Sequence, residues 1–296
     1  MIKPLLLDSL TLNFNKKRIF TAEFSSFLLM FKKTYFFSDV HFGLQEKPIE
    51  DVKIETMLSL FDEIKREGSR LFMVGDILDY WMEYKHAVPK GHTRFFNGLI
   101  DLVNAGIKVD YLAGNHDFYL GSYFKDELGV DTHYGAIREV IDGKNFYIVH
   151  GDGVGKGDLG YKIFRTLVRN NFNLWWYRGL HPNLGVGLMA YLSKLSRKHT
   201  YSPKDEGEKE RLIVFANEIG ATEPLDYFIC GHRHIVKLHP LHTCNGFYVN
   251  CGTWIGGMPT YAVFNGKSME IRKAKNHEVL YQEHSALVES PLAESI

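Results

Sequence analysis

Residues able to bind a metal ion stand at the ends of several strand-like runs of this sequence. Asp39 and His41 follow the run "YFFS" and are two positions apart, so both side chains point to one side of an extended chain. Four further runs end in a carboxylate, an amide or an imidazole. The seven candidate ligands are Asp39, His41, Asp76, Asn115, His150, His232 and His234. These ligand types suit Mn, Fe, Zn or Mg better than metals that prefer thiolates.

The elements that must position these residues alternate between strand-like and helical patterns. Strand-like runs precede Asp39, Asp76 and Asn115, and helical spacing of apolar residues covers 51–67 and the region around 95–103. This order predicts an α/β fold with a largely parallel sheet. Ligand sites in such sheets form at the carboxyl ends of the strands, so we expect the seven candidates to converge.

Antiparallel additions follow this alternating part of the chain. Asp142-Gly143 and Asn265-Gly266 each separate two strand-like patterns. Both dipeptides favour the tight turns that join antiparallel strands, so the sequence predicts two hairpins.

The candidate ligands predict two divalent cations. Asp76 follows Gly75 in a predicted tight turn, and its two oxygens can bridge two cations. Only Asp39 and Asp76 bring negative charge, so the site would stay positive even with a bridging hydroxide. Such a site attracts phosphate and lowers the pKa of bound water, which yields a nucleophile for in-line displacement.

The motifs D-x-H, G-D-x-x-D, G-N-H-D, H-G-D and G-H-x-H occur in this order over roughly residues 33–255. As a set they resemble the calcineurin-like metallophosphoesterases. The resemblance implies a four-layer αββα sandwich and two metal ions, with manganese expected and Fe, Zn or Mg as alternatives. It implies one metal on Asp39, His41 and His234, the other on Asn115, His150 and His232, with Asp76 bridging.

The same resemblance implies roles for the residues beside these ligands. His116 resembles the family's catalytic histidine, which contacts the phosphate and aids the leaving group. Asp79, the last residue of "GDILD", resembles the carboxylate that orients this histidine. Asp117 is then expected to be structural.

Residues 156–200 differ from the rest of the chain. They hold eight Lys or Arg and one acidic residue, Asp158, in a protein whose formal net charge is zero. Apolar residues from Ile163 to Trp176 recur at helical spacing. One interpretation is a helical hairpin packed on the core. The other is a basic, amphipathic cap that binds an anionic or amphiphilic ligand.

The stretch "HGDGVGKGDLGYKIFR" is similar to the corresponding segment of the UDP-2,3-diacylglucosamine hydrolases, the pyrophosphatases of lipid A synthesis. Those enzymes insert a helical cap here for the acyl chains. The resemblance implies that Asp158 and Tyr161 face the sugar of the substrate, while Arg197 and Lys198 are candidate phosphate contacts. Better-known members carry arginine where this chain has His116, so another nucleotide-linked or lipid-linked phosphate stays open.

These patterns leave three candidate functions for the chain. The first is hydrolysis of UDP-2,3-diacylglucosamine to UMP and the lipid monosaccharide phosphate. The second is a phosphodiesterase or phosphatase acting on soluble nucleotides or other phosphoesters, for which an apolar cap is not required. The third is a scaffold without activity, which the complete set of seven ligands and His116 disfavours.

The composition indicates the class of ligand and the cellular location of the protein. Lys plus Arg equals Asp plus Glu at 35 each, which argues against a general nucleic-acid binder. Three cysteines without a CxxC pair favour a reducing cytoplasm, and no apolar run approaches a membrane span. The first 29 residues lack the pattern of a signal peptide. We expect a cytoplasmic protein, peripheral on the inner membrane.

The predicted domain boundaries follow from these patterns. Residues 1–29 form an N-terminal extension, because Met30 lies directly before the first convincing strand and could be the working start. The metallophosphoesterase domain covers 30–275 with the cap inserted at about 156–211. Residues 276–296 are polar and weakly patterned, which predicts a C-terminal tail.

Overall fold

A seven-stranded sheet carries most of the predicted α/β pattern. The computed structural model describes residues 32–155, 166–167, 170–189, 191 and 205–283. In this sheet β1, β2, β4 and β6 are parallel neighbours, and β12 joins antiparallel to β1. The order is β14 (Val279–Gln282), β13 (Met269–Lys273), β12 (Thr260–Phe264), β1 (Lys33–Phe37), β2 (Gly68–Val74), β4 (Lys108–Leu112) and β6 (Asp131–His133).

A second sheet has five strands and stacks against the first. Its order is β10 (Val236–Pro240), β11 (Phe247–Cys251), β9 (Tyr227–Cys230), β8 (Lys144–Ile148) and β7 (Ile137–Ile141). A small parallel pair, β3 (Trp81–Met82) and β5 (Asp117–Tyr119), lies in the loops beyond β2 and β4.

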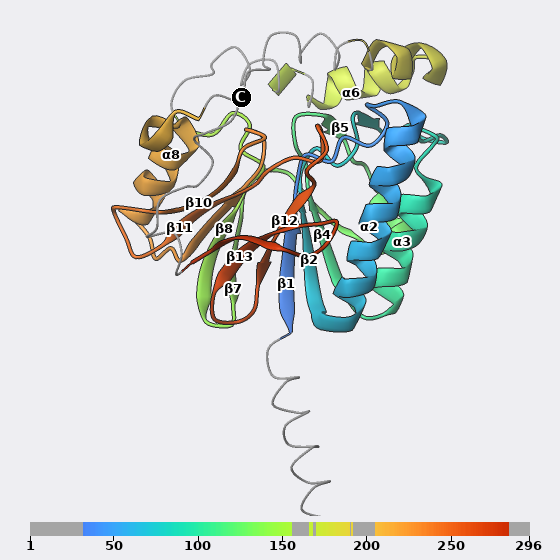
Figure 1. Ribbon diagram of the computed structural model, residues 1–296. Coiled ribbons are helices and arrows are strands. Elements are labelled where there is room, and N and C mark those ends of the chain that lie inside the picture. Colours follow the sequence, from blue (N-terminus) through green and yellow to red (C-terminus); the bar gives the residue numbers. More distant parts are fainter. Residues whose placement is uncertain (1–31, 156–165, 168–169, 190, 192–204, 284–296) are drawn as a thin grey trace, which may run out of the picture. The chain divides into compact units, whose positions relative to one another are not determined.

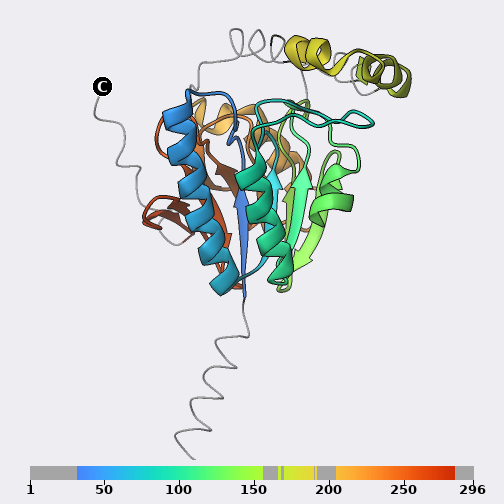
Figure 2. The ribbon, with the colours of Figure 1, turned by 90° about the vertical axis from the view of Figure 1, so that its right-hand side faces the viewer.

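Helices cover the two outer faces, as Figures 1 and 2 show for α2 (Lys47–Glu67) and α3 (Thr93–Asn104) on the larger sheet. The short α4 (Tyr123–Leu128) continues this layer. On the other side, α8 (Arg211–Gly220) follows the 3₁₀ turn η1 (Gly207–Lys209) and packs on the smaller sheet. The result is helix, sheet, sheet, helix, which confirms the predicted four-layer αββα sandwich.

Alternation along β1 explains why two sheets stack. Tyr35 and Phe37 are buried in the cluster beneath α2 and α3, whereas Phe36 is buried in the cluster between the sheets. In β2, Met73 is likewise buried in the cluster beneath α2 and α3, and Phe72 in the cluster between the sheets. A strand with apolar residues on both faces must be covered on both sides, because successive side chains point to opposite faces.

The hairpin predictions are confirmed. Asp142 and Gly143 join β7 to β8, and both have positive φ, 49° and 77°. Two consecutive residues with positive φ form a tight turn whose twist matches that of the two antiparallel strands. Asn265 and Gly266 lie in the connection between β12 and β13.

The predicted C-terminal tail needs a correction. β14, at Val279–Gln282, pairs with β13, so the sheet continues beyond the boundary drawn at residue 275. This strand was not predicted because it is an edge strand whose residues are exposed or half-buried. It therefore lacks the strict apolar alternation of a covered strand. The predicted extension, residues 1–29, lies outside the described residues.

The described part of the predicted cap is helical. α6 spans Asn171–Arg178, and residues 182–189 form a further helical stretch. Leu174, Tyr177 and Met189 are buried against Met82 and Phe118 of the small β3–β5 pair. This contact places the segment at the end of the sandwich where β2 and β4 finish (Figure 1).

Candidate metal centre

Loops at the carboxyl ends of five strands bring the candidate ligands together. Asp39 and His41 follow β1, Asp76 follows β2, and Asn115 follows β4. From the smaller sheet, His150 follows β8, and His232 and His234 follow β9. The two sheets therefore meet at the site, and the convergence expected from the strand order is present in the structure.

The backbone of these loops is unusual. Asp39, His41, Asp76, His232 and His234 have φ of 52°, 49°, 54°, 66° and 56°. Positive φ in residues other than glycine is uncommon and costs about 1 kcal/mol or more at each position. Among the described residues, only two other non-glycine residues share this conformation. Concentrated backbone strain of this kind is typical of a functional site.

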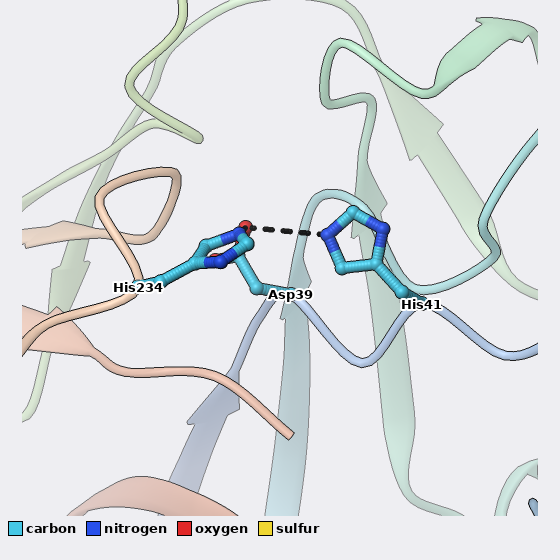
Figure 3. Close-up of side chains that lie close together, drawn as sticks. All are labelled: Asp39, His41 and His234. Atoms are coloured by element: carbon cyan, nitrogen blue, oxygen red, sulfur yellow. Dashed lines mark ion pairs between the residues drawn. The ribbon is translucent and has the colours of Figure 1, made fainter. Parts of the chain in front are cut away.

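The first group consists of Asp39, His41 and His234. The Nε2 atom of His234 lies 3.1 Å from Oδ1 of Asp39, and the Nε2 atom of His41 lies 3.9 Å from the same oxygen. Figure 3 shows that the two imidazoles come from different loops and point toward one carboxylate. All three ligand atoms lie within 4.8 Å of one another, which would allow one cation to contact them all.

The second group consists of Asn115, His150 and His232. The Oδ1 atom of Asn115 lies 3.2 Å from Nε2 of His150 and 3.0 Å from Nδ1 of His232. Oδ2 of Asp76 lies 3.2 Å from Nε2 of His150 and 3.8 Å from Nε2 of His41. One carboxylate oxygen thus lies near both groups, where a bridging ligand would have to be.

Buried ligand atoms without hydrogen bonds test whether these residues fit a metal. Both ring nitrogens of His41 are buried without a hydrogen-bond partner among the described residues. Leaving such a group unpaired costs about 1–3 kcal/mol, and a cation bound at Nε2 would remove that cost for this nitrogen. The oxygen and imidazole donors are those of a divalent first-row metal or Mg²⁺, so the residues fit the predicted ions.

The charges of the site also favour a cation. Burial would raise the pKa of Asp39, but the neighbouring His234 outweighs it and the pKa falls to about 2. Burial likewise opposes ionisation of Asp76, yet His150 and His116 hold its pKa well below the ordinary value. Burial lowers the pKa of His232 to about 4, which leaves a neutral imidazole with a lone pair to donate.

His116 lies beside both groups. Its backbone N–H donates to Oδ1 of Asp76 at 2.8 Å, and its ring packs edge-on against His41 with centroids 4.7 Å apart. Its Nδ1 is 2.7 Å from the backbone carbonyl of Asp79. Because a carbonyl can only accept, Nδ1 carries a proton.

Asp79 therefore contacts His116 in a way that the sequence did not predict. Its carboxylate Oδ1 lies 4.0 Å from Nδ1 of His116 but only 3.4 Å from Nδ1 of His41. The carbonyl, rather than the carboxylate, makes the short contact with His116. The carboxylate is closer to a candidate metal ligand, where it would favour the tautomer that leaves Nε2 free.

Asp117 joins two ligand loops. Its buried carboxylate accepts hydrogen bonds from the backbone N–H of Asp76 at 3.0 Å and of Gly114 at 2.8 Å. The hydroxyl of Tyr111 donates to its other oxygen at 2.6 Å. This arrangement is the structural role expected for Asp117.

Gly114 and Gly231, which precede the candidate ligands Asn115 and His232, have a role that was not predicted from the sequence. A Cβ atom at Gly114 would lie 2.2 Å from Oδ1 of Asp76, and one at Gly231 would lie 2.3 Å from Oδ2 of Asp39. Both carboxylates rest directly on the backbone of another ligand loop. The repeated glycine before a ligand in the motifs G-N-H and G-H-x-H was the available signal.

The family follows from the whole set of motifs. Residues 32–236 match the model of the calcineurin-like phosphoesterase family. This chain is a calcineurin-like phosphoesterase. Membership of this phosphoesterase family implies divalent metal ions and indicates a hydrolase, in agreement with the residue groups that could hold an ion.

Relatives of this phosphoesterase carry one repeated name. A UDP-2,3-diacylglucosamine hydrolase of Porphyromonas gingivalis is 32% identical over 265 residues, covering 84% of this chain and all of the relative. A protein of the same name from Vibrio atlanticus is 24% identical over 252 residues, covering 81% of this chain and 96% of its own. Among solved structures, the E. coli phosphoesterase Yfce is 15% identical, with a TM-score of 0.45, and covers 84% of this chain and 97% of its own.

An apolar cavity lies beside the cap of this phosphoesterase. It has a volume of about 340 Å³ and is lined by Met82, Phe118, Leu167, Asn173, Leu174, Trp176, Tyr177 and Met189. The outer surface of the segment is also apolar, with Trp175 and Trp176 exposed by 71% and 61%. The predicted substrate contacts Asp158, Tyr161, Arg197 and Lys198 lie outside the described residues.

Proposed function

We propose that this chain hydrolyses the diphosphate of UDP-2,3-diacylglucosamine to UMP and the lipid monosaccharide phosphate. The observation that carries the proposal is the position of Asp76, whose Oδ2 lies near both ligand groups, at an end of the sandwich that also carries an apolar cavity. A site for two cations suits a diphosphate, and an apolar cavity suits acyl chains. The relative from Porphyromonas gingivalis, matched over its whole length, carries the corresponding name.

In this proposal Asp39, His41 and His234 would hold one divalent ion, Asn115, His150 and His232 would hold the other, and the two ions would share Asp76. When bound, the two cations supply positive charge for the phosphate oxygens and a water of lowered pKa as nucleophile. Manganese is the proposed metal, since the site mixes carboxylate and amide oxygens with imidazole nitrogens.

His116 acts on the phosphate through Nε2. The Asp79 carbonyl holds the proton on Nδ1, which orients Nε2 away from the Asp79 loop. A protonated Nε2 can donate to a phosphate oxygen or to the oxygen of the leaving group as the phosphorus–oxygen bond breaks. Asp79 is therefore a positioning residue for His116 in this proposal.

The cap provides selectivity for the lipid. Phe118, Leu174 and Trp176 line the 340 Å³ cavity, and acyl chains placed there would gain about 0.8 kcal/mol for each buried methylene. Asp158 and Tyr161 are proposed to face the sugar, and Arg197 and Lys198 to contact phosphate. These four contacts rest on the sequence alone.

A peripheral position on the inner face of the membrane is part of the same proposal. No helix in the described residues is long and apolar enough to cross a bilayer. Phe172, Trp175 and Leu184 expose apolar surface of the kind that enters the boundary between headgroups and acyl chains. The eight basic residues of 156–200 would add attraction to anionic lipids.

One assay tests the proposed function. Purified full-length protein with Mn²⁺ is given UDP-2,3-diacylglucosamine, an aryl phosphodiester and an aryl phosphomonoester in parallel. We expect release of UMP from the lipid substrate, with kcat/KM far above those for both aryl compounds. Equal or faster cleavage of UDP-sugars without acyl chains would replace the lipid assignment with a soluble-nucleotide activity.

A further inference from the structure

A second cavity, of about 450 Å³, lies between the N-terminal ends of α2 and α3. Its lining includes Gln45, Asp51, Tyr80, Lys90, His92 and Phe95. The loop that leaves β1 leads directly into α2, so this cavity is at the same end of the sandwich as the candidate ligands (Figure 1). It is separate from the apolar cavity beside the cap, with which it shares no lining residue.

This cavity shares a wall with the metal centre. Phe42, which follows His41, and Tyr80, which follows Asp79, both line it. The two loops are joined at this point, because the Asp79 N–H donates to the Phe42 carbonyl at 3.0 Å. Each loop thus presents one residue to the metal centre and the next residue to the cavity. The cavity therefore lies next to the two loops that carry His41 and Asp79.

Aromatic rings of the cavity suit a planar ligand. Tyr80 and His92 are half-buried, so part of each ring is accessible. Burial lowers the pKa of His92 to about 4, and its ring is therefore neutral at pH 7. A neutral imidazole and a phenol offer faces on which a nucleobase can stack, which contributes about 1–3 kcal/mol for each base.

The two carboxylates of the cavity, Glu50 and Asp51, differ in how strongly their present partners hold them. Glu50 accepts from the N–H groups of Gly43 and Gln45 and from Lys53, so both of its oxygens are occupied. Both oxygens of Asp51 accept from Lys47 Nζ, at 2.9 and 2.7 Å, but the Asp51 and Lys47 side chains are largely exposed, 53% and 83%. An exposed ion pair of this kind is worth less than about 1 kcal/mol. Asp51 can therefore accept from a pair of hydroxyl groups on a ligand.

Gln45 has an unsatisfied acceptor. Its Oε1 is buried without a hydrogen-bond partner among the described residues. An unpaired buried acceptor costs about 1–3 kcal/mol, and a donor brought by a ligand would recover it after a small rotation of the terminal amide. An amide also offers N–H donors beside its oxygen, which matches a ligand edge that alternates donor and acceptor.

We propose that this cavity is a nucleoside subsite that holds the base and ribose of a uridine nucleotide while its phosphate lies at the metal centre. Uracil carries an N3–H donor between two carbonyl acceptors, the pattern that the Gln45 amide can pair with. Asp51 accepts from the ribose hydroxyls, and the rings of Tyr80 and His92 flank the base. The inference rests on the proposed function for the nucleotide, and it adds where the uridine binds.

Calorimetric titration of the Mn²⁺-loaded full-length protein tests the subsite. The probes are UMP, 2′-deoxy-UMP, ribose 5-phosphate and inorganic phosphate, measured with the wild type and with Gln45→Leu and Asp51→Ala. Gln282→Leu in β14 and Asp101→Ala on the exposed side of α3 are the matched controls. We expect the wild type to bind UMP at least about 10-fold more tightly than ribose 5-phosphate.

Each variant should remove one part of this preference. Gln45→Leu should lower the preference for UMP over ribose 5-phosphate by about 10-fold, since the base loses its polar partner. Asp51→Ala should remove the preference for UMP over 2′-deoxy-UMP. Both controls should keep the wild-type ratios. Unchanged ratios in Gln45→Leu and Asp51→Ala, or UMP binding no tighter than inorganic phosphate, would overturn the inference.

The same protein batches separate this inference from the proposed function. If the wild type hydrolyses UDP-2,3-diacylglucosamine but the two variants keep the wild-type binding ratios, the hydrolase stands and the subsite is wrong. If the lipid is not hydrolysed but the ratios change as expected, the nucleoside subsite stands and the lipid substrate is wrong.

Discussion

The metal centre and the cap are built under opposite physical constraints. At the metal centre, Asp39, Asp76 and His150 are buried, and the loops that carry them are fixed by hydrogen bonds and by close backbone contacts. In the cap, Trp175 and Trp176 are mostly exposed, and a small apolar cluster joins the segment to the β3–β5 pair. A substitution in the first region changes buried contacts, whereas a substitution at Trp175 or Trp176 changes a mostly exposed side chain.

This difference separates chemistry from selectivity. In the proposed function, any phosphoester that reaches the metal centre would meet the same candidate ligands and the same His116. Only a substrate with apolar chains would gain from the cavity around Trp176. Substitutions in the first region should therefore affect every substrate, and substitutions in the second should affect the lipid most.

The largest effect is expected from Asp76→Ala. In the proposed site both ion positions would lose their shared anionic ligand, so kcat/KM should fall by about 10⁴-fold or more for the lipid and the aryl substrates alike. Metal analysis by mass spectrometry should show fewer than two ions per chain. Asp101→Ala, on an exposed helix face, is the control. Two bound ions with near-normal turnover in Asp76→Ala would refute the ligand assignment.

His116→Ala should be nearly as damaging but should leave the metals in place. In the proposed function the imidazole contributes charge or a proton in the transition state, so we expect kcat to fall by about 10²–10⁴-fold with both ions retained. His116→Arg should keep more activity on the diphosphate than alanine does, because it restores a positive donor. Loss of a metal ion in His116→Ala would make this residue a ligand instead.

Asp117→Ala tests whether the hydrogen bonds of Asp117 at the metal centre stabilise the fold. The substitution leaves the N–H groups of Asp76 and Gly114 and the hydroxyl of Tyr111 without their partner. We expect the free energy of unfolding to fall by about 3 kcal/mol in urea denaturation. Asp101→Ala should change it by less than about 0.5 kcal/mol. An equal change in the free energy of unfolding for the two substitutions would show that Asp117 does not stabilise the fold.

Trp176→Ser tests the cap and should have a smaller, selective effect. Loss of the ring from the apolar cavity should lower kcat/KM for the diacylated substrate by about 10-fold relative to the aryl phosphodiester. Val140→Ser, at an exposed position of β7 far from the cap in sequence, should leave that ratio unchanged. If shortening the acyl chains has no effect on the wild type, the cavity does not bind them.

The smallest effect concerns the membrane. Phe172 and Trp175 expose apolar surface, so replacing both with serine should reduce sedimentation with anionic vesicles by about three-fold. High salt should reduce the remaining binding by screening the basic residues. Vesicle binding that responds to neither treatment would place the membrane contact elsewhere on the chain.

The convergence of the candidate ligands could be predicted because strand order determines it. Parallel strands end at one edge of the sheet, so Asp39, Asp76 and Asn115 had to lie near one another once the alternation of strands and helices was recognised. Dipeptides such as Asp142-Gly143 specified hairpins for a similarly local reason. Both inferences use residue types whose backbone preferences act over a few positions.

Other features depend on contacts that the sequence does not encode locally. The Asp79 carbonyl faces His116, and this follows from the path of a loop that is held by a backbone bond to Phe42. The cavity between α2 and α3 arises from the spacing of two helices, to which Gln45 and His92 contribute from distant positions. The edge strand β14 has no covered face, so no strong apolar pattern could reveal it.

The pairing of β1 with β12 also sets an order of events during synthesis. β1 is made first, but its antiparallel neighbour begins at Thr260, so one edge of β1 stays unpaired until most of the chain has left the ribosome. An open edge strand that includes the apolar residues Tyr35, Phe36 and Phe37 is a template for association with other chains. Nascent chains that stop before Thr260 should therefore pellet on centrifugation, whereas chains released after β12 should remain in the supernatant.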